Sequence, residues 1–293
     1  MGLTPRPRHY CKGVSLELNR AEEQGKVGAE AIRDGERAGR LVASLQENEV
    51  RGRHAWVALE DHGLREGESP DLYQDLYSEA ARVWVDAGFL DHYVVVPADP
   101  GVLEAWYSLS FAQQQVHGAQ KLGPLSPAEP EGFSVRQAGS EDIDAAMTLA
   151  FTIFDHQAEA PTWAGAPAPP EGEARASYSE YLADPDVTYF LAERDGEPLG
   201  HLALERESES TVYLSIAATA PEARGLGVGK VLTEIALAWA YEQGYGTCVT
   251  DWRSANLLSA RFWPNRGFSP TAYRLYRAIT LTPRDQPRRS ARA

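Results

Sequence analysis

The sequence predicts a two-lobed α/β protein, and three observations support this. Strand-like apolar runs alternate with amphipathic helical runs between residues 55 and 281. A stretch with three prolines and two glycines, residues 122–132, separates these runs into two groups and is typical of a linker. The order and spacing of glycines, helices and strands in the first group also recur in the second, which indicates two copies of one unit.

The composition is that of an ordinary globular protein. The chain has 293 residues, of which 43% are hydrophobic and 24% are charged. No apolar run approaches the roughly 20 residues of a membrane span, and the first residues contain no signal-peptide core, so we expect a cytoplasmic protein. The formal net charge of −14 disfavours binding to nucleic acid or to an anionic membrane and favours a cationic or neutral partner.

Neither cysteines nor histidines form a metal-binding pattern. Cys11 and Cys248 lie far apart and in no C-x-x-C pair, which argues against a disulfide framework and a thiolate zinc site. The seven histidines include no H-x-x-x-H pair. We therefore expect no metal in this protein.

The first half of the chain divides into a lead-in and a lobe. Residues 1–50 are polar and show no continuous apolar stripe, so we interpret them as a partly helical lead-in. Residues 51–121 form the first lobe, with Asp99 as the expected N-cap of its second helix and Pro100 in the first turn. The lobe is expected to contain a strand, a helix, a second strand and a short helix, at residues 55–59, 71–88, 92–96 and 99–109.

The second half, residues 133–281, contains a longer series of the same kinds of element. The acidic Gly turn DGEP joins two strands as a hairpin. Residues 282–293 form a basic tail that we expect to be disordered. The expected strands lie at 133–138, 188–194, 199–205, 211–219, 247–250 and 273–281, and the expected helices at 141–156, 174–183, 226–243 and 256–267.

The repeat is visible when the two halves are aligned. Gly88 and Gly244 follow the long helix of each half, 156 positions apart, and Phe111 and Phe268 are 157 positions apart. Because the offset hardly drifts, the halves are interpreted as copies of one unit.

The most informative segment runs from Arg224 to Lys230, between a strand and an amphipathic helix. Glycines at such a junction let a ligand approach the backbone, and the unpaired amides of the first helical turn attract phosphate. Two familiar phosphate loops do not match. A Walker loop requires Gly where Arg224 stands and Ser or Thr where Val231 stands, and a dinucleotide fingerprint requires Gly where Lys230 stands.

The segment Arg224-x-x-Gly227-x-Gly229 resembles the acyl-coenzyme A pyrophosphate loop of the GNAT superfamily of N-acyltransferases. Asn256 at the start of a helix, followed by Phe262-Trp263 and Gly267-Phe268, resembles the downstream motif of that superfamily. The likeness covers about residues 133–281. It implies the GNAT fold, a mixed central sheet flanked by helices, for this catalytic domain.

The resemblance also implies the cofactor and its site. Acetyl-CoA is the expected acyl donor, its pyrophosphate held by loop amides and its pantetheine arm by the open edge of the preceding strand and by Asn256. The implied cofactor-binding residues are Ala217, Ala218, Thr219, Arg224, Gly225, Leu226, Gly227, Val228, Gly229, Lys230, Asn256 and Trp263.

Acyl transfer to an amine requires a base, an oxyanion donor and a proton for the leaving thiolate. Many relatives place an acidic Tyr where this chain has Trp263, whose indole N–H is no acid near neutral pH. The candidate substitutes for this acid are Ser259, which lies one helical turn earlier, Tyr273 and a water molecule. The candidate bases are His201, Glu205 and Asp251, each of which also has a structural interpretation as a core histidine, a solvated carboxylate or a helix cap.

The acceptor is expected to be a small-molecule or peptide amine. Asp155, His156 and Trp163 lie in the region that borders the acceptor pocket in GNAT enzymes, so they are candidate substrate-binding residues. The first lobe has the acidic sequence GLREGESPD in place of the glycine loop and resembles a truncated, degenerate GNAT half, as in tandem GNAT proteins of the mycothiol synthase type.

Two alternatives stay open. One is a regulatory protein that binds acyl-CoA without turnover, and the other is a scaffold built from the tandem halves. A homodimer is compatible with the expected transferase.

Overall fold

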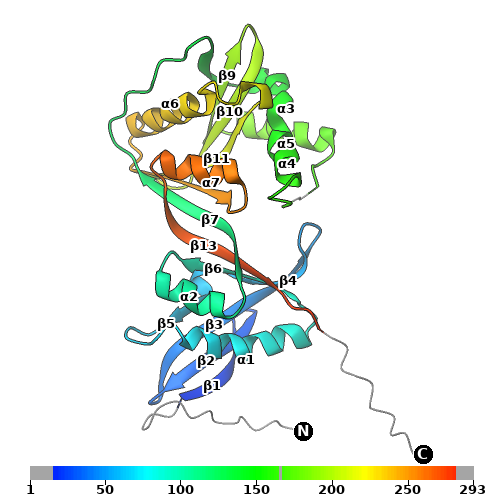
Figure 1. Ribbon diagram of the computed structural model, residues 1–293, viewed down its shortest axis with the longest axis vertical. Coiled ribbons are helices and arrows are strands. Elements are labelled where there is room, and N and C mark those ends of the chain that lie inside the picture. Colours follow the sequence, from blue (N-terminus) through cyan, green and yellow to red (C-terminus); the bar gives the residue numbers. More distant parts are fainter. Residues whose placement is uncertain (1–15, 165–166, 282–293) are drawn as a thin grey trace, which may run out of the picture. The chain divides into compact units, whose positions relative to one another are not determined.

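A computed structural model of the protein describes residues 16–164 and 167–281, in two compact units (Figure 1). The first unit comprises the chain up to Gln113 and from Arg274 on, and the second comprises Gln114–Tyr273. The division therefore falls before the expected linker at 122–132, because β7 (Ala112–Lys121) pairs with β12 (Thr247–Arg253) in the second unit. Residues 122–133 form an irregular segment. The expected basic tail at 282–293 lies outside the described residues.

The prediction of a partly helical lead-in is wrong for the residues that the structure describes. From Leu16 on the chain forms three antiparallel strands, β1 (Leu16–Glu23), β2 (Lys26–Arg33) and β3 (Glu36–Asn48). Two-residue turns at Gln24-Gly25 and Asp34-Gly35, all with positive φ, join them. Asp-Gly is a strong hairpin signal, which the sequence interpretation overlooked because the strands carry small and charged residues. The early strands of the first lobe are therefore present.

The remainder of the first unit follows the expected order. Strand β4 (Gly52–Val57) pairs with β3 and runs parallel to β6 (Asp91–Pro97). Helix α1 (Leu72–Asp86) connects β4 to β6. Asp99 accepts a hydrogen bond from the backbone N of Val102 at 2.9 Å, which confirms it as the N-cap of α2 (Pro100–Ser108). The short elements η1 (Leu59–Asp61) and β5 (His62–Leu64) precede α1, and β5 pairs with β3.

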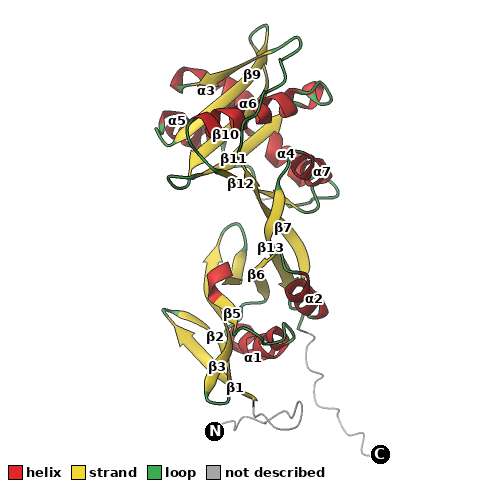
Figure 2. Ribbon diagram, turned by 90° about the vertical axis from the view of Figure 1, so that its left-hand side faces the viewer, coloured by secondary structure: helices red, strands yellow, loops and turns green. Residues whose placement is uncertain are grey.

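Six strands of the second unit follow the order β8-β9-β10-β11-β12-β7 in the sheet, and β13 (Ser269–Ala278), which begins in this unit, lies next to β7. Neighbours among these six strands are antiparallel except β11 and β12, which are parallel. Helix α6 covers one face of this sheet, and α3 with α5 covers the other (Figure 2). Its remaining elements are β8 (Ser134–Ala138), η2 (Ser140–Asp142), α3 (Ile143–Ala150), α4 (Thr152–Ala158), α5 (Glu171–Ala183), β9 (Val187–Arg194), β10 (Glu197–Arg206), β11 (Thr211–Thr219), η3 (Pro221–Ala223), α6 (Val228–Glu242) and α7 (Leu257–Asn265).

The last strand, β13 (Ser269–Ala278), starts in the second unit and ends in the first. Its carboxyl-terminal part is held there by side-chain and backbone hydrogen bonds. The hydroxyl of Tyr276 donates to Asp91 Oδ1 at 2.5 Å, and the backbone N of Ile279 donates to the carbonyl of Leu90 at 2.8 Å. Residues 274–281 therefore complete the first unit, although the sequence placed them in the second domain.

The internal repeat holds element by element. Helices α1 and α6 each have 15 residues and begin at 72 and 228, which are 156 positions apart. Strands β6 and β12 each have 7 residues and begin at 91 and 247. Gly88 and Gly244, with φ of +83° and +92°, follow the two long helices. The first unit is truncated at one place, because a tight turn joins β1 to β2 where α3, α4 and α5 separate β8 from β9.

Among the described residues, none of the helices is both long and apolar enough to cross a membrane.

We predict that Gly28→Ala destabilises the first unit by about 1–3 kcal/mol in urea unfolding. A Cβ on Gly28 would overlap the carbonyl oxygen of Leu41 and lie 2.8 Å from the Cα of Val42, because β2 and β3 approach closely there. The matched control is Gly63→Ala, since a Cβ on Gly63 meets no atom within 4 Å among the described residues. Equal stabilities of the two variants would contradict this register of β2 on β3.

Candidate active site

The site begins where two parallel strands separate. Strands β11 and β12 pair only from Thr211–Leu214 with Thr247–Thr250, although β11 continues to Thr219 and β12 to Arg253. On its other side β11 stays paired with β10 as far as Thr219. The edge of residues 215–219 that faces away from β10 is therefore released from the sheet.

A bulge in β11 lies at the point of separation. Ala203 of β10 pairs with Ile216 and Leu204 pairs with Leu214, which leaves Ser215 as an extra residue. Bulges bend the strand that carries them and increase its twist. The hydroxyl of Thr250 donates to the carbonyl of Leu214 at 2.9 Å, at the last joined pair of β11 and β12. The bulge and this hydrogen bond together set where the opening starts.

The glycine-rich loop follows β11 and leads into α6. Gly225 and Gly227 both have a φ of +82°, a conformation that favours glycine. Gly227 occupies the N-cap position and has no side chain to bond the first amides of the helix. The N–H groups of Val228, Gly229 and Lys230 precede the first backbone hydrogen bond of the helix, from Val231 N to the carbonyl of Gly227. This helix start is suited to an anion.

Gly229 also provides room for a ligand at the helix start. A Cβ on this residue would lie 3.2 Å from Oγ1 of Thr219 and 3.8 Å from the ring of Phe262. The absence of a side chain therefore leaves a cradle between α6, β11 and α7. The exposed side chains of Arg224 and Lys230 add positive charge beside it.

A cavity of about 650 Å³ connects the loop to the strand opening. Its size suits a substantial organic ligand. The predicted site residues that line it are Ala217, Ala218, Thr219, Arg224, Gly225, Gly227, Val228, Gly229, Lys230, Asn256, Trp263, His156, His201, Asp251 and Ser259. Most of the residues singled out in the sequence are thus brought together in one place.

Four predicted residues are not among those that line the cavity. Leu226 and Trp163 are 49% and 73% exposed, and Asp155 is exposed on α4. Glu205 accepts a hydrogen bond from the hydroxyl of Tyr181 at 2.6 Å, on the face of the sheet that α5 covers. Their predicted roles in binding or catalysis stay predictions.

Helix α7 forms another wall of the cavity. Asn256 is buried, and its Oδ1 accepts hydrogen bonds from the backbone N of Leu258 and of Ser259, both at 3.2 Å. This carbonyl also lies 3.2 Å from Nε2 of His156 on α4. Trp263 is buried and packs edge-on against Phe268 at a centroid distance of 5.4 Å. Asn256 thus acts as the N-cap of α7 and ties α4 to it.

Of the three candidate bases, His201 is a buried core histidine. Its Nδ1 lies in hydrogen-bond contact with the hydroxyl of Tyr189, and its ring stacks parallel to that of Tyr178. Burial lowers the pKa of His201 to about 3. Its Nε2 is buried and lacks a partner among the described residues. A ring that is so difficult to protonate is a poor base near neutral pH.

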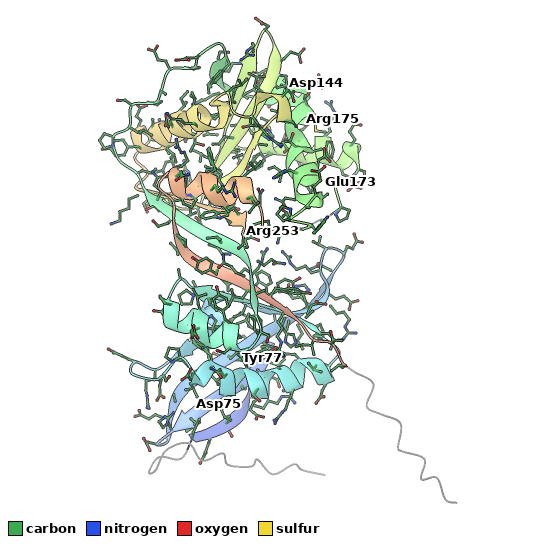
Figure 3. All side chains as sticks on the ribbon, viewed as in Figure 1. Asp75, Tyr77, Asp144, Glu173, Arg175 and Arg253 are labelled. Atoms are coloured by element: carbon green, nitrogen blue, oxygen red, sulfur yellow. The ribbon has the colours of Figure 1, made fainter. Side chains whose placement is uncertain are left out.

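Asp251 is the candidate base with the most suitable surroundings. The hydroxyl of Tyr213 donates to its Oδ1 at 2.5 Å, and the amide of Gln115 donates to its Oδ2. Burial and the neighbouring carboxylate raise the pKa of Tyr213, so this hydroxyl stays protonated. Asp251 and Arg253, the latter labelled in Figure 3, line the cavity beyond the point where β12 leaves β11.

Sequence reasoning missed the residues that position Asp251. Gln115 lies on β7 and is 136 positions away from Asp251 in the sequence. Tyr213 lies on β11. No local pattern indicates either contact, since both depend on strand order. The alternation of inward and outward side chains along β11 could have indicated which face of the sheet Tyr213 occupies, but the bulge at Ser215 interrupts this alternation.

The first unit fills the corresponding place with side chains. Tyr73 occupies the position 156 residues before Gly229, and His62 the position 156 residues before Ala218. Nδ1 of His62 lies 3.1 Å from the hydroxyl of Tyr73, and Nε2 lies 2.8 Å from the carbonyl of Val95 on β6. Val95 lies 156 positions before Asp251, so the contact with its carbonyl matches the part of β12 that has separated from β11 in the second unit.

The described residues contain no group of three or more His, Cys, Asp or Glu side chains arranged to hold a metal ion.

We predict that the second unit loses stability as the pH falls below 6.5, the usual pKa of histidine. His201 binds a proton in the unfolded chain more readily than in the folded one. Its contribution is therefore complete above that pH and falls by up to about 1.4 kcal/mol per pH unit toward its folded pKa. Urea unfolding over this pH range should give a steeper dependence for the wild type than for His201→Gln. Identical slopes would contradict this assignment.

The chain is similar to known proteins both in sequence and in structure. The sequence model described as the Acetyltransferase (GNAT) family matches residues 152–268. The mycothiol acetyltransferase of Cellulomonas flavigena is 29% identical over 160 residues, which are 51% of this chain and 44% of that protein. The chain thus matches less than half of the length of this relative.

Solved structures show the same fold. A GCN5-related N-acetyltransferase from Sphaerobacter thermophilus superimposes with a TM-score of 0.61 at 15% identity, covering 87% of this chain and 81% of that chain. A tandem GNAT protein from the clavulanic acid biosynthesis pathway gives a TM-score of 0.52 at 15% identity, covering 92% of this chain and 85% of that one. The prediction of a GNAT fold is confirmed, and residues 152–268 of this chain match the sequence model of the GNAT acetyltransferase family.

Proposed function

We propose that the second unit transfers an acetyl group from acetyl-CoA directly to an amine, without a covalent enzyme intermediate. The observation that carries this proposal is the single cavity that joins the uncapped start of α6 to the opening between β11 and β12. It combines an anion site, an exposed strand edge and a carboxylate. When bound, acetyl-CoA supplies the thioester that is the acyl donor.

The binding residues follow from the geometry. Amides at 228–230 would hold the diphosphate, with Arg224 beside it. The free edge of residues 217–219 would pair with the amides of the pantetheine arm, as a strand pairs with its neighbour. Gly229 fits this proposal because a side chain there would fill the cradle.

Asp251 would receive the amine. Its carboxylate attracts the cationic amine, which loses its extra proton to solvent and so gains a lone pair. Asp251 then takes one further proton from the nitrogen as the neutral amine attacks the thioester carbon. Tyr213 and Gln115 fix the orientation of the carboxylate by donating to its two oxygens. A backbone N–H on the released edge of β11 would donate to the developing oxyanion.

The acceptor class follows from charge and from the comparison. The net charge of −14 and the carboxylate in the cavity favour a cationic amine on a small molecule or a peptide. The relative from Cellulomonas flavigena, named for acetylation of mycothiol, makes a small-molecule amine the first class to test.

One observation favours a second function, the binding of acyl-CoA without turnover. Trp263 lies buried in α7 at the cavity wall, and its indole N–H is a hydrogen-bond donor but no acid. A chain that lacks a proton donor for the leaving thiolate would bind the donor and release it unchanged.

We predict that Gly229→Val weakens the binding of acetyl-CoA at least tenfold in calorimetric titration. The new side chain would meet Thr219 and obstruct the amides at the start of α6. Gly172→Ala on α5 is the control, since a Cβ there meets no described atom within 4 Å. If the wild type does not bind acetyl-CoA, or if both variants bind it equally, the proposed cofactor site is wrong.

We predict that Asp251→Asn lowers kcat by about 10²-fold or more and leaves the affinity for acetyl-CoA within about twofold. The amide keeps the size of the side chain but cannot take up the amine proton at neutral pH. Release of free thiol is measured with spermidine, glucosamine and a peptide with a free α-amine as acceptors. An active wild type with an equally active Asp251→Asn variant would exclude Asp251 as the base.

A further inference from the structure

His156 on α4 lines the cavity, and the proposed mechanism leaves its imidazole without a role. The ring is half-buried, and its Nε2 lies 3.2 Å from Oδ1 of Asn256. That oxygen already accepts two backbone N–H groups of α7, which identifies it as the carbonyl end of the amide. Because a carbonyl only accepts, Nε2 of His156 must carry a hydrogen and donate it.

The second ring nitrogen, Nδ1, takes no part in the contact with Asn256. Nδ1 of His156 makes no hydrogen bond to any described residue, and it is absent from the buried, unsatisfied polar atoms of the same part of the chain. The contact with Asn256 therefore holds the ring in the wall of the cavity by Nε2 and leaves Nδ1 without a hydrogen-bond partner among the described residues.

Transfer of the acetyl group needs a group of this kind. When the bond between carbon and sulfur breaks, the leaving thiolate has to gain a proton. The other titratable groups that line the cavity are unsuited to supply it at neutral pH. Tyr213 is committed to Asp251, His201 is held neutral by burial, and the guanidinium and ammonium groups of Arg224, Arg253 and Lys230 are very weak acids.

We propose that His156 is the proton donor to the leaving sulfur, an assignment that rests on the proposed function. The amine nitrogen bonds to the thioester carbon and passes one proton to Asp251. The bond between carbon and sulfur then breaks, its electron pair goes to sulfur, and the imidazolium of His156 gives the proton on Nδ1 to the thiolate. Asp251 then loses its proton to water and His156 takes one up from water, which restores both groups, so each turnover moves one proton from nitrogen to sulfur.

The charges around His156 come from every neighbouring element. Asp155 and Glu159 flank it on α4 and at its end, Asp251 and Arg253 line the cavity from β12, and Tyr213 lines it from β11. On α7 the neighbour is the neutral Asn256. The contribution of His156 is therefore measured as the difference between wild type and a His156 variant in which all of these groups stay unchanged.

The test is an ultraviolet titration of the thiol of free CoA bound to the protein, which needs no knowledge of the acceptor. The background is Cys11→Ser, since burial raises the pKa of the Cys248 thiol to about 12 and keeps it silent. Calorimetry first confirms that CoA binds to each variant. An imidazolium beside the sulfur should lower the pKa of the bound thiol by about one unit or more, relative to His156→Gln.

Glu159→Gln, at the exposed end of α4, is the matched control and should titrate like the wild type. His156→Asn is a second variant that keeps an amide near Asn256 and should titrate like His156→Gln. Equal thiol pKa values in wild type and both His156 variants would overturn the assignment and leave the proposed function standing. A shift that persists in these variants and disappears in Arg253→Gln would also overturn it. Absence of CoA binding to the wild type would overturn both proposals.

Discussion

The separation of β11 from β12 is the constraint on which the rest of the site depends. Parallel strands normally satisfy each other's backbone groups along their whole length, and an edge is released only where something forces them apart. Here the extra residue Ser215 bends β11, while the hydrogen bond of Thr250 to the carbonyl of Leu214 holds the strands together just before the opening. In the proposed site, the residues that line the cavity can act on a ligand because the edge of β11 at residues 215–219 is free to pair with it.

The two units differ in the side chains that stand at the start of the long helix and on the strand before it. Both place a 15-residue helix after a strand, with a parallel strand 19 residues after the helix start. Ala218 and Gly229 leave space in the second unit. His62 and Tyr73 fill the matching positions in the first and bond to each other and to the carbonyl of Val95. The larger side chains of His62 and Tyr73 thus occupy, in the first unit, the positions that Ala218 and Gly229 hold beside the cavity of the second.

Charge is distributed along the cavity in a way that suits two different reactants. The helix start and Arg224 present positive charge and free amides at one end. Asp251, fixed by Tyr213 and Gln115, presents negative charge where β12 has left β11. In the proposed reaction, the anionic donor and the cationic acceptor would therefore be attracted to different parts of the same cavity, with the exposed strand edge between them.

The sequence by itself determined the features whose signals are local. The glycines at 225, 227 and 229, the helix that follows them and the offset of the repeat could be read from the chain, because turn conformation and helical periodicity are properties of neighbouring residues. The sequence signals for the strands at 16–48 were also local, since the Asp34-Gly35 turn indicates one of their hairpins. Only their small and charged composition concealed them.

Tertiary structure decided which of the predicted residues can act together. In the folded chain Gln115 donates to Asp251, and His156 contacts Asn256. His201 is buried in the core, and Glu205 accepts a hydrogen bond from Tyr181. Tertiary structure also assigned the chain's last described residues to the first unit. Such contacts join segments separated by about 24 to 185 positions, so they depend on strand order and helix packing, which no local pattern of residues encodes.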